Sequence, residues 1–296
     1  MTIAIEVFIL FTVVLIGALA RRLRYLTDET IRGITQLVVN ITLPCLTIAN
    51  MQRPFSADIL HNFVITMVLS FLTVLICMGL GLLIFRKRPH ARRAVLANLG
   101  AFSNCGFMGY PIILAINPDW MIYAVAYNIS FTFACWTFGV MLYCGRENVD
   151  FRKALINPNT ISAAIGFALF CMRVSLPSVC MRVLNLVGGL TTPLSMLLIG
   201  PRICGIHPQD FKDWDYHFSA ALRLVAFPLI IYALLHLLPI APAVASTIYL
   251  LTCMPSGTLV SMQAELYGGD AVFAARAAAY STLLCMVTVP IMSMLL

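Results

Sequence analysis

Apolar stretches long enough to cross a lipid bilayer recur along nearly the whole chain. A membrane-spanning helix needs about 20 mostly apolar residues. The 296-residue chain is 61% hydrophobic and only 10% charged, whereas soluble domains carry roughly 25% charged residues. We therefore predict an all-α polytopic membrane protein. Ten transmembrane helices are predicted, at approximately residues 3–20, 31–50, 61–85, 93–116, 120–144, 158–176, 182–203, 216–238, 243–266 and 271–295.

The polar segments between these helices are too short to form a further domain. The longest runs from Gly145 to Asn157. The first apolar run has Glu6 near its start and three arginines after it, whereas a cleavable signal peptide carries its positive charge in front. We therefore predict that the first helix is retained.

The distribution of basic residues predicts the orientation of the helices. Most of the 19 Lys and Arg residues follow predicted helices one, three, five, seven and nine, and the opposite side holds Arg53, Arg173 and Arg182. Because cytoplasmic loops carry an excess of Lys and Arg, we expect both termini to lie outside the cell membrane. The basic residues are not interleaved with aromatic ones, so no nucleic-acid partner is predicted.

Matched prolines indicate that the ten helices form two inverted repeats of five. Pro44 and Pro193 lie in predicted helices two and seven, and Pro111 and Pro255 lie in helices four and nine. Each marked helix thus has a counterpart five helices later, which indicates an inverted repeat. The predicted division is 1–144 for the first repeat, 145–157 for a cytoplasmic linker and 158–296 for the second repeat.

Helices four and nine carry residues that interrupt a helix. The stretch NLGAFSNCGFMGYPIILAI, from Asn98 to Ile116, holds three glycines and a proline, and helix nine holds Pro255 followed by Ser, Gly and Thr. Broken backbone in a membrane is tolerated only where it is buried in protein or lines a wet cavity. If the two breaks cross near the midplane, their half-helix N-termini would favour an anion. The alternative is that these residues only allow close helix packing and kinks.

At these residues the sequence resembles the auxin efflux carrier superfamily, which includes plant auxin exporters and bacterial transporters. The most specific segments are SNCGFMGYP (Ser103–Pro111) and MPSGTLVSMQAELYGGD (Met254–Asp270), and the closing AAYSTLLCMVTVPIM is similar to the family's last helix. The resemblance implies crossed broken helices four and nine, an elevator-type mechanism and a homodimer. It also implies a scaffold of helices one, two, six and seven, with helices three to five and eight to ten as the moving transport part.

The resemblance matches Asn104, Pro111 and Pro255 to the family's helix-four asparagine and to its two crossover prolines. The chain lacks the long cytoplasmic loop of plant members, so it is similar to compact prokaryotic members of the inner membrane. The resemblance therefore does not imply auxin as the substrate.

Asn104 is the main side-chain candidate for binding a substrate. Its uncharged amide offers two donors and one acceptor, which suits a carboxylate that must bind and leave again; the alternative is an amide that caps broken backbone. Asn128 in helix five either lines the site or packs against protein. The predicted substrate-binding residues are Asn104, Cys105, Gly106, Pro111, Asn128, Pro255, Ser256, Gly257 and Thr258. The scaffold-side candidates are Asn40, Pro44, Thr192 and Pro193, for which structural hydrogen bonding is the alternative.

Charged residues are expected at the edges of the membrane. The twelve acidic residues lie at predicted helix ends or in loops, so no proton relay or carboxylate sodium site is indicated. Glu265 is a candidate cytoplasmic gate or a partner of Arg276, with simple solvation at the membrane surface as the alternative. Arg223 is predicted to extend to the cytoplasmic headgroups, or else to attract an anionic substrate.

We conclude from the sequence that the protein is a secondary transporter of small organic anions such as mono- or dicarboxylates. Uniport or weak coupling is favoured, and a sodium- or proton-coupled carrier of similar crossed-helix fold is the alternative. A non-transporting membrane receptor is a further alternative. The ten cysteines form no CxxC pair and no HxxxH pattern occurs, so we predict no metal site, no cofactor and no enzyme activity.

Overall fold

The structure is a computed structural model that describes residues 2–145, 156–206 and 212–296. The described residues form helices joined by short links, so the predicted all-α class is confirmed. Six helical segments are long and apolar enough to cross a membrane, and three shorter apolar helices accompany them. The six are Asp28–Met51, Ala57–Ile84, Pro118–Cys144, Ser178–Ile203, Trp214–His236 and Ala271–Leu295, and the three are Cys105–Ile116, Pro158–Cys171 and Pro242–Cys253.

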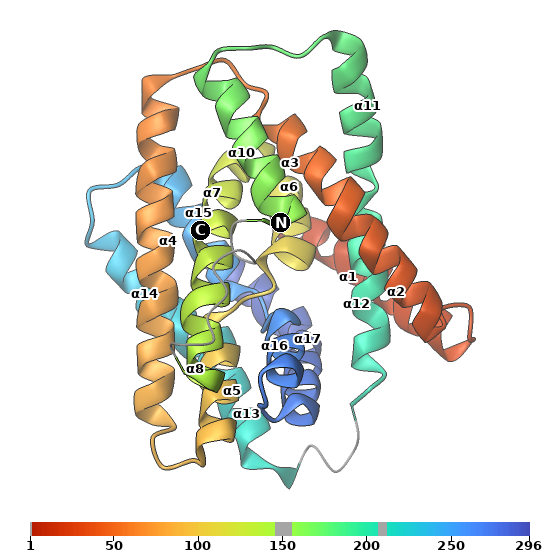
Figure 1. Cartoon of the computed structure of the whole chain (residues 1–296), viewed down its shortest axis with the longest axis vertical. Coiled ribbons are helices and arrows are strands. Elements are labelled where there is room, and N and C mark those ends of the chain that lie inside the picture. Colours follow the sequence, from red (N-terminus) through yellow and green to blue (C-terminus); the bar gives the residue numbers. More distant parts are fainter. Residues whose placement is uncertain (1, 146–155, 207–211) are drawn as a thin grey trace.

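The first half of the chain runs from α1 to α8 (Figure 1). Several of its segments contain a short helical turn that is not α-helical, labelled η. The turns η1, η2 and η4 are wider than an α-helix, and η3 is tighter. The elements are α1 (Thr2–Arg22), α2 (Asp28–Leu37), η1 (Val38–Thr42), α3 (Leu43–Met51), α4 (Ala57–Ile84), α5 (His90–Ala101), η2 (Cys105–Gly109), α6 (Tyr110–Ile116), η3 (Pro118–Trp120), α7 (Met121–Ala134), η4 (Cys135–Gly139) and α8 (Val140–Cys144).

The second half begins after the predicted linker 145–157, of which residues 146–155 lie outside the described residues. Its elements are α10 (Pro158–Cys171), α11 (Ser178–Gly189), α12 (Thr191–Ile203), α13 (Trp214–Ala221), η7 (Leu222–Ala226), α14 (Phe227–His236), α15 (Pro242–Cys253), α16 (Leu259–Leu266), α17 (Ala271–Met292) and η8 (Ser293–Leu295). The six long segments begin and end within a few residues of the predicted spans.

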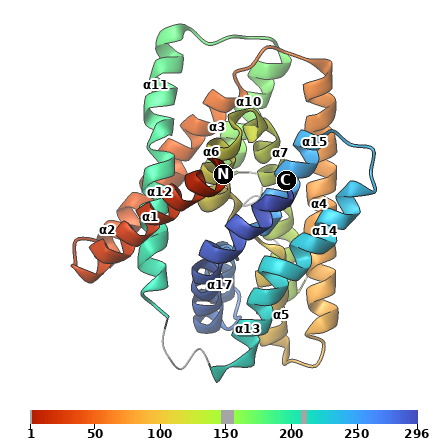
Figure 2. The same cartoon turned by 180° about the vertical axis from the view of Figure 1, so that it is seen from behind.

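The helices pack as two groups that lie side by side (Figures 1 and 2). In the first group, α1 packs along α12, and α3 packs against α10 and α11. In the second group, α4 packs against α5 and α7, α14 against α15, and α16 against α17. The two groups meet where α1 and α12 contact α17, α6 and η2.

Glycine allows the very close approach of α1 and α12. A Cβ added at Gly200 would lie 2.3 Å from the backbone oxygen of Val14, and one added at Gly17 would lie 2.2 Å from the backbone oxygen of Leu197. Both distances are far below van der Waals contact, so a larger residue at either position would push the helices apart. Small residues at helix interfaces have this role in membrane proteins.

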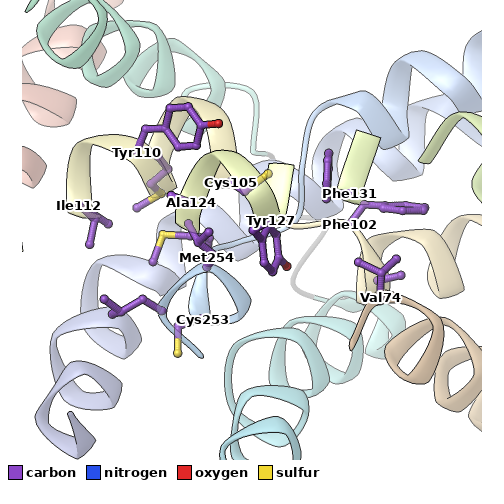
Figure 3. Close-up of a cluster of buried hydrophobic side chains, with 14 of the residues drawn as sticks. Val74, Phe102, Cys105, Tyr110, Ile112, Ala124, Tyr127, Phe131, Cys253 and Met254 are labelled. Carbon is purple, nitrogen blue, oxygen red and sulfur yellow. The ribbon is translucent and has the colours of Figure 1, made fainter. Parts of the chain in front are cut away.

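The outward faces of the helices are apolar, as lipid contact requires. On α4, the exposed large side chains include Val64, Val68, Leu72 and Ile76, which recur every four residues and so form one stripe. The buried side of the bundle contains both apolar and polar side chains. Its apolar core surrounds the interruption between α5 and η2, where Figure 3 shows Phe102, Cys105, Cys253 and Met254 among the clustered side chains.

Candidate functional site

Two helical segments are interrupted in the middle of the bundle, and their links cross. The first link separates α5 from η2 and the second separates α15 from α16. The backbone N–H of Asn104 donates to the Pro255 oxygen (2.7 Å), and the N–H of Gly257 donates to the Phe102 oxygen (2.7 Å). Ser103 and Ser256 thereby form an isolated antiparallel bridge. This pairing satisfies backbone groups that the interruptions leave without helical partners.

The second interruption follows directly from its sequence. Pro255 disfavours helical backbone in the residue before it, and Met254 is extended, with ψ of 149°. A Cβ added at Gly257 would lie 3.0 Å from the Ser103 backbone oxygen, so glycine allows the two links to approach. Ser256 stabilises the crossing through two hydrogen bonds. Its hydroxyl donates to the Leu99 oxygen (2.9 Å), and its N–H donates to the Ser281 hydroxyl (3.1 Å).

The first interruption does not lie at its proline. The helix is already broken at residues 102–104, whereas Pro111 lies within the helical segment Cys105–Ile116, directly after the wider turn η2. Proline has no N–H to donate to the preceding turn, and a wider turn accommodates this loss without breaking the segment. Pro111 is buried and does not line the central cavity described below.

Arg223 joins the two helix C-termini that meet at this crossing. Its guanidinium donates to the oxygens of Gly100 at the end of α5 (2.8 Å) and of Thr252 and Met254 at the end of α15 (2.9 Å each). The prediction that Arg223 extends to the headgroups is wrong, since the residue is only 1% exposed. The last carbonyls of a helix lack partners within the helix and carry partial negative charge, so they stabilise a buried guanidinium without a carboxylate.

The two helix N-termini at the crossing face a cavity of about 450 Å³ instead. The cavity lies between the two helix groups, because its walls come from α2, η1, α10 and α12 on one side and from η2, α7, η4 and α16 on the other. Its lining residues are Thr35, Val39, Leu43, Ser103, Asn104, Cys105, Gly106, Phe107, Asn128, Phe131, Thr132, Trp136, Asn157, Pro158, Asn159, Arg202, Gly257, Thr258, Leu259 and Met262.

The structure brings six of the predicted substrate-binding residues together in this wall. They are Asn104, Cys105, Gly106, Asn128, Gly257 and Thr258. Pro255 and Ser256 are buried in the crossing and do not line the cavity. Glu265, the candidate gate, is exposed on α16 and also lies outside the lining.

The scaffold-side candidates lie away from the cavity. Asn40 and Pro193 are exposed, and Pro44 and Thr192 are partly buried. The contact in this region is made by neighbouring residues, since the Thr191 hydroxyl donates to the Thr42 hydroxyl over 3.0 Å. Thr42 and Thr191 each precede one of the matched prolines by two positions.

A chain of side-chain amides fixes one wall of the cavity. The Asn128 amide nitrogen donates to the Cys105 sulfur (3.5 Å), while its oxygen accepts from Thr132 (3.1 Å) and from the Asn159 amide (2.6 Å). Asn159, the second residue of α10, was not among the predicted site residues. Two asparagines that flank Pro158 in a membrane protein were the available signal.

The free polar groups of the cavity suit an anion. Asn104 is 5% exposed, and its side-chain amide makes no capping hydrogen bond to η2. The first N–H groups of a helix have no acceptor within the helix, and Cys105 and Gly106 begin η2. Among the described lining residues, Arg202 is the only charged one. The described residues contain no group of three His, Cys, Asp or Glu side chains that could hold a metal ion.

Comparisons with known proteins place the chain in a transporter family. The model of a family described as membrane transport protein matches residues 2–150 and again residues 146–293. An uncharacterized transporter of Methanocaldococcus jannaschii is 22% identical over 281 residues, covering 89% of each chain. Another, of Methanothermobacter thermautotrophicus, is 23% identical over 291 residues, covering 96% of this chain and 95% of its own. The chain therefore belongs to the membrane transport protein family, that of the auxin efflux carriers, and is an integral multi-pass membrane protein.

Proposed function

We propose that the protein is a secondary transporter that moves small organic anions, with a carboxylate group, through the central cavity. The observation that carries this proposal is the segregation of helix ends at the crossing. Arg223 occupies the two C-terminal ends, whereas both N-terminal ends border the cavity. Each N-terminus carries about half a positive charge, and Arg202 adds a full charge, so the described lining favours a negatively charged solute.

Asn104 would bind the carboxylate, together with the first N–H groups of η2. Its amide can donate a hydrogen bond without adding a fixed charge. A site built from partial charges binds an anion less tightly than a dedicated ion pair would, which allows release on the other side. Asn128 would hold Cys105 and Asn159 in place rather than bind substrate itself, because its amide is already engaged.

The ten-span inverted repeat is part of the proposal. One family model matches both halves of the chain. In addition, Thr42 contacts Thr191, its counterpart by the offset of Pro44 and Pro193, and the two interrupted segments pair at Ser103 and Ser256. Residues near a two-fold axis meet their own counterparts, so these contacts support a pseudo-symmetric arrangement of 1–144 with 158–296.

We propose an elevator-type movement between the two helix groups. The scaffold would comprise α1, α2–α3, α10 and α11–α12, and the transport part would comprise the remaining helices, including both interrupted segments. The cavity lies between these groups, so sliding one past the other would carry it across the membrane. The proposal includes both termini outside the cell membrane, and a homodimer that holds the scaffold still.

Reconstituted transport tests the proposed function. Purified protein in proteoliposomes would be assayed by solid-supported-membrane currents with a panel of mono- and dicarboxylates, at varied sodium concentration and pH. We expect saturable flux of at least one carboxylate, and a loss of most of this flux in Asn104→Ala. Binding of a carboxylate without any flux would instead support a receptor. Flux that requires sodium or a pH gradient would support the coupled alternative.

A further inference from the structure

Arg202 lies where the central cavity meets a second one. The second cavity has a volume of about 340 Å³ and is bounded by the end of α12, by α16 and by α17. Arg202 and Thr258 line both cavities. The two cavities therefore adjoin at these two residues.

The Arg202 guanidinium is available to a ligand. Within the described residues it makes no ion pair and no hydrogen bond, and its guanidinium carbon lies 5.6 Å from the centre of the Phe107 ring. Phe107 belongs to η2, one turn after Asn104, so this contact holds the charge beside the first turn of that half-helix. A guanidinium carries five donors and stays protonated.

The described residues that line the two cavities supply no counter-charge for Arg202. The described residues that line the second cavity include Ser261 and Arg276 and no acidic side chain. The central cavity likewise has no acidic residue among its described lining. A partly buried cation without a carboxylate partner is costly, and an anionic group of the substrate would offset this cost.

From this arrangement we propose that Arg202 determines specificity by binding a second anionic group of the substrate. The first carboxylate lies at the start of η2 with Asn104, and the second lies on Arg202 at the entrance to the second cavity. The preferred substrates are then dicarboxylates rather than monocarboxylates. This inference rests on the proposed function, because it concerns the same cavity and the same transported anions.

A purely structural role for Arg202 makes a different prediction. A cation in the last turn of α12 stabilises that helix through its dipole. Loss of this stabilisation would lower the amount of active protein and affect every substrate alike. Recognition of a second carboxylate would change only the affinity for dianions.

Succinate and butyrate form the decisive pair of substrates, because both have four carbons and differ by one carboxylate. In the wild-type protein we expect a lower KM for succinate than for butyrate. We expect Arg202→Gln to raise the KM of succinate by about 30-fold or more, the usual effect of removing one partner of a desolvated charge pair. The KM of butyrate should stay within about twofold. Arg202→Lys, which keeps the charge but not the planar fork, should recover part of the succinate affinity.

Arg32→Gln is the matched control, since it removes the same charge from an exposed position on α2 outside both cavities. It should leave both KM values unchanged. Equal losses for succinate and butyrate in Arg202→Gln, or a wild-type preference for butyrate, would overturn the assignment while leaving the proposed function standing. A wild-type protein that moves no carboxylate at all would overturn both.

Discussion

Replacing Arg223 by methionine tests how the crossing of the two interrupted segments is held together. The substitution removes a buried guanidinium and its three hydrogen bonds to the ends of α5 and α15. Hydrogen bonds to a charged group contribute about 1.5–3 kcal/mol each, so roughly 5–9 kcal/mol of interaction is lost. Burying a charge costs several kcal/mol, and methionine avoids this cost. We therefore expect a net loss of about 3–5 kcal/mol.

Thermal unfolding of the purified protein in detergent measures this loss. At about 2–4 °C per kcal/mol for a chain of this size class, the expected shift is a decrease of roughly 6–20 °C. Arg223→Lys should fall between methionine and wild type, because a lysine ammonium cannot span three carbonyls in the geometry of a guanidinium. The exposed Arg32→Gln serves as the control and should shift the midpoint by little. A midpoint for Arg223→Met equal to that of the control would refute this account of the crossing.

Three further substitutions test separate parts of the structure. Gly257→Val places a branched side chain where even a Cβ would lie 3.0 Å from the Ser103 oxygen, so we expect loss of transport and a stability lowered by about 1–3 kcal/mol; wild-type flux would contradict the close approach of the two links. Gly200→Leu should separate α1 from α12 and lower stability in the same assay, whereas Gly33→Leu, at a position with open space, should not. Asn104→Asp adds a negative charge to the cavity, so carboxylate KM should rise about tenfold or more through like-charge repulsion; an unchanged KM would place the substrate elsewhere.

The positions of the long helices followed directly from hydropathy. Length and apolar composition alone specify a spanning helix, and the segments Ala57–Ile84 and Ala271–Leu295 lie close to their predicted bounds. The interruption before α16 could also be predicted from the sequence, because Pro255 disfavours helical backbone in the residue before it and Gly257 allows a close approach. By contrast, the break before η2 lies at residues 102–104, where no proline marks it.

Residues whose roles depend on distant backbone could not be assigned from sequence. In the sequence, Arg223 is an arginine towards the start of an apolar helix. Its carbonyl partners come from the ends of α5 and α15, which meet only in the folded structure. Arg202 and Asn159 lie at the ends of predicted helices, where polar residues are usual, yet the fold brings both to the cavity. Asn104 was identified because a polar residue beside a break inside an apolar span has few structural explanations.

The matched prolines identified counterpart helices but not the residues that touch. Pro44 and Pro193 marked helices two and seven as counterparts. In the structure these two segments contact each other through Thr42 and Thr191, two residues before each proline. A sequence offset can therefore indicate paired helices, while the residues that touch depend on the rotation of each helix.

The position of a bound carboxylate in an experimental structure tests the central claim most directly. The account predicts density for the anion in the central cavity, with a carboxylate oxygen within hydrogen-bonding distance of the Asn104 amide and of the first N–H groups of η2. It also predicts that the segments containing Asn104 and Pro255 are interrupted and crossed. An anion bound elsewhere, or a continuous helix through either segment, would contradict it.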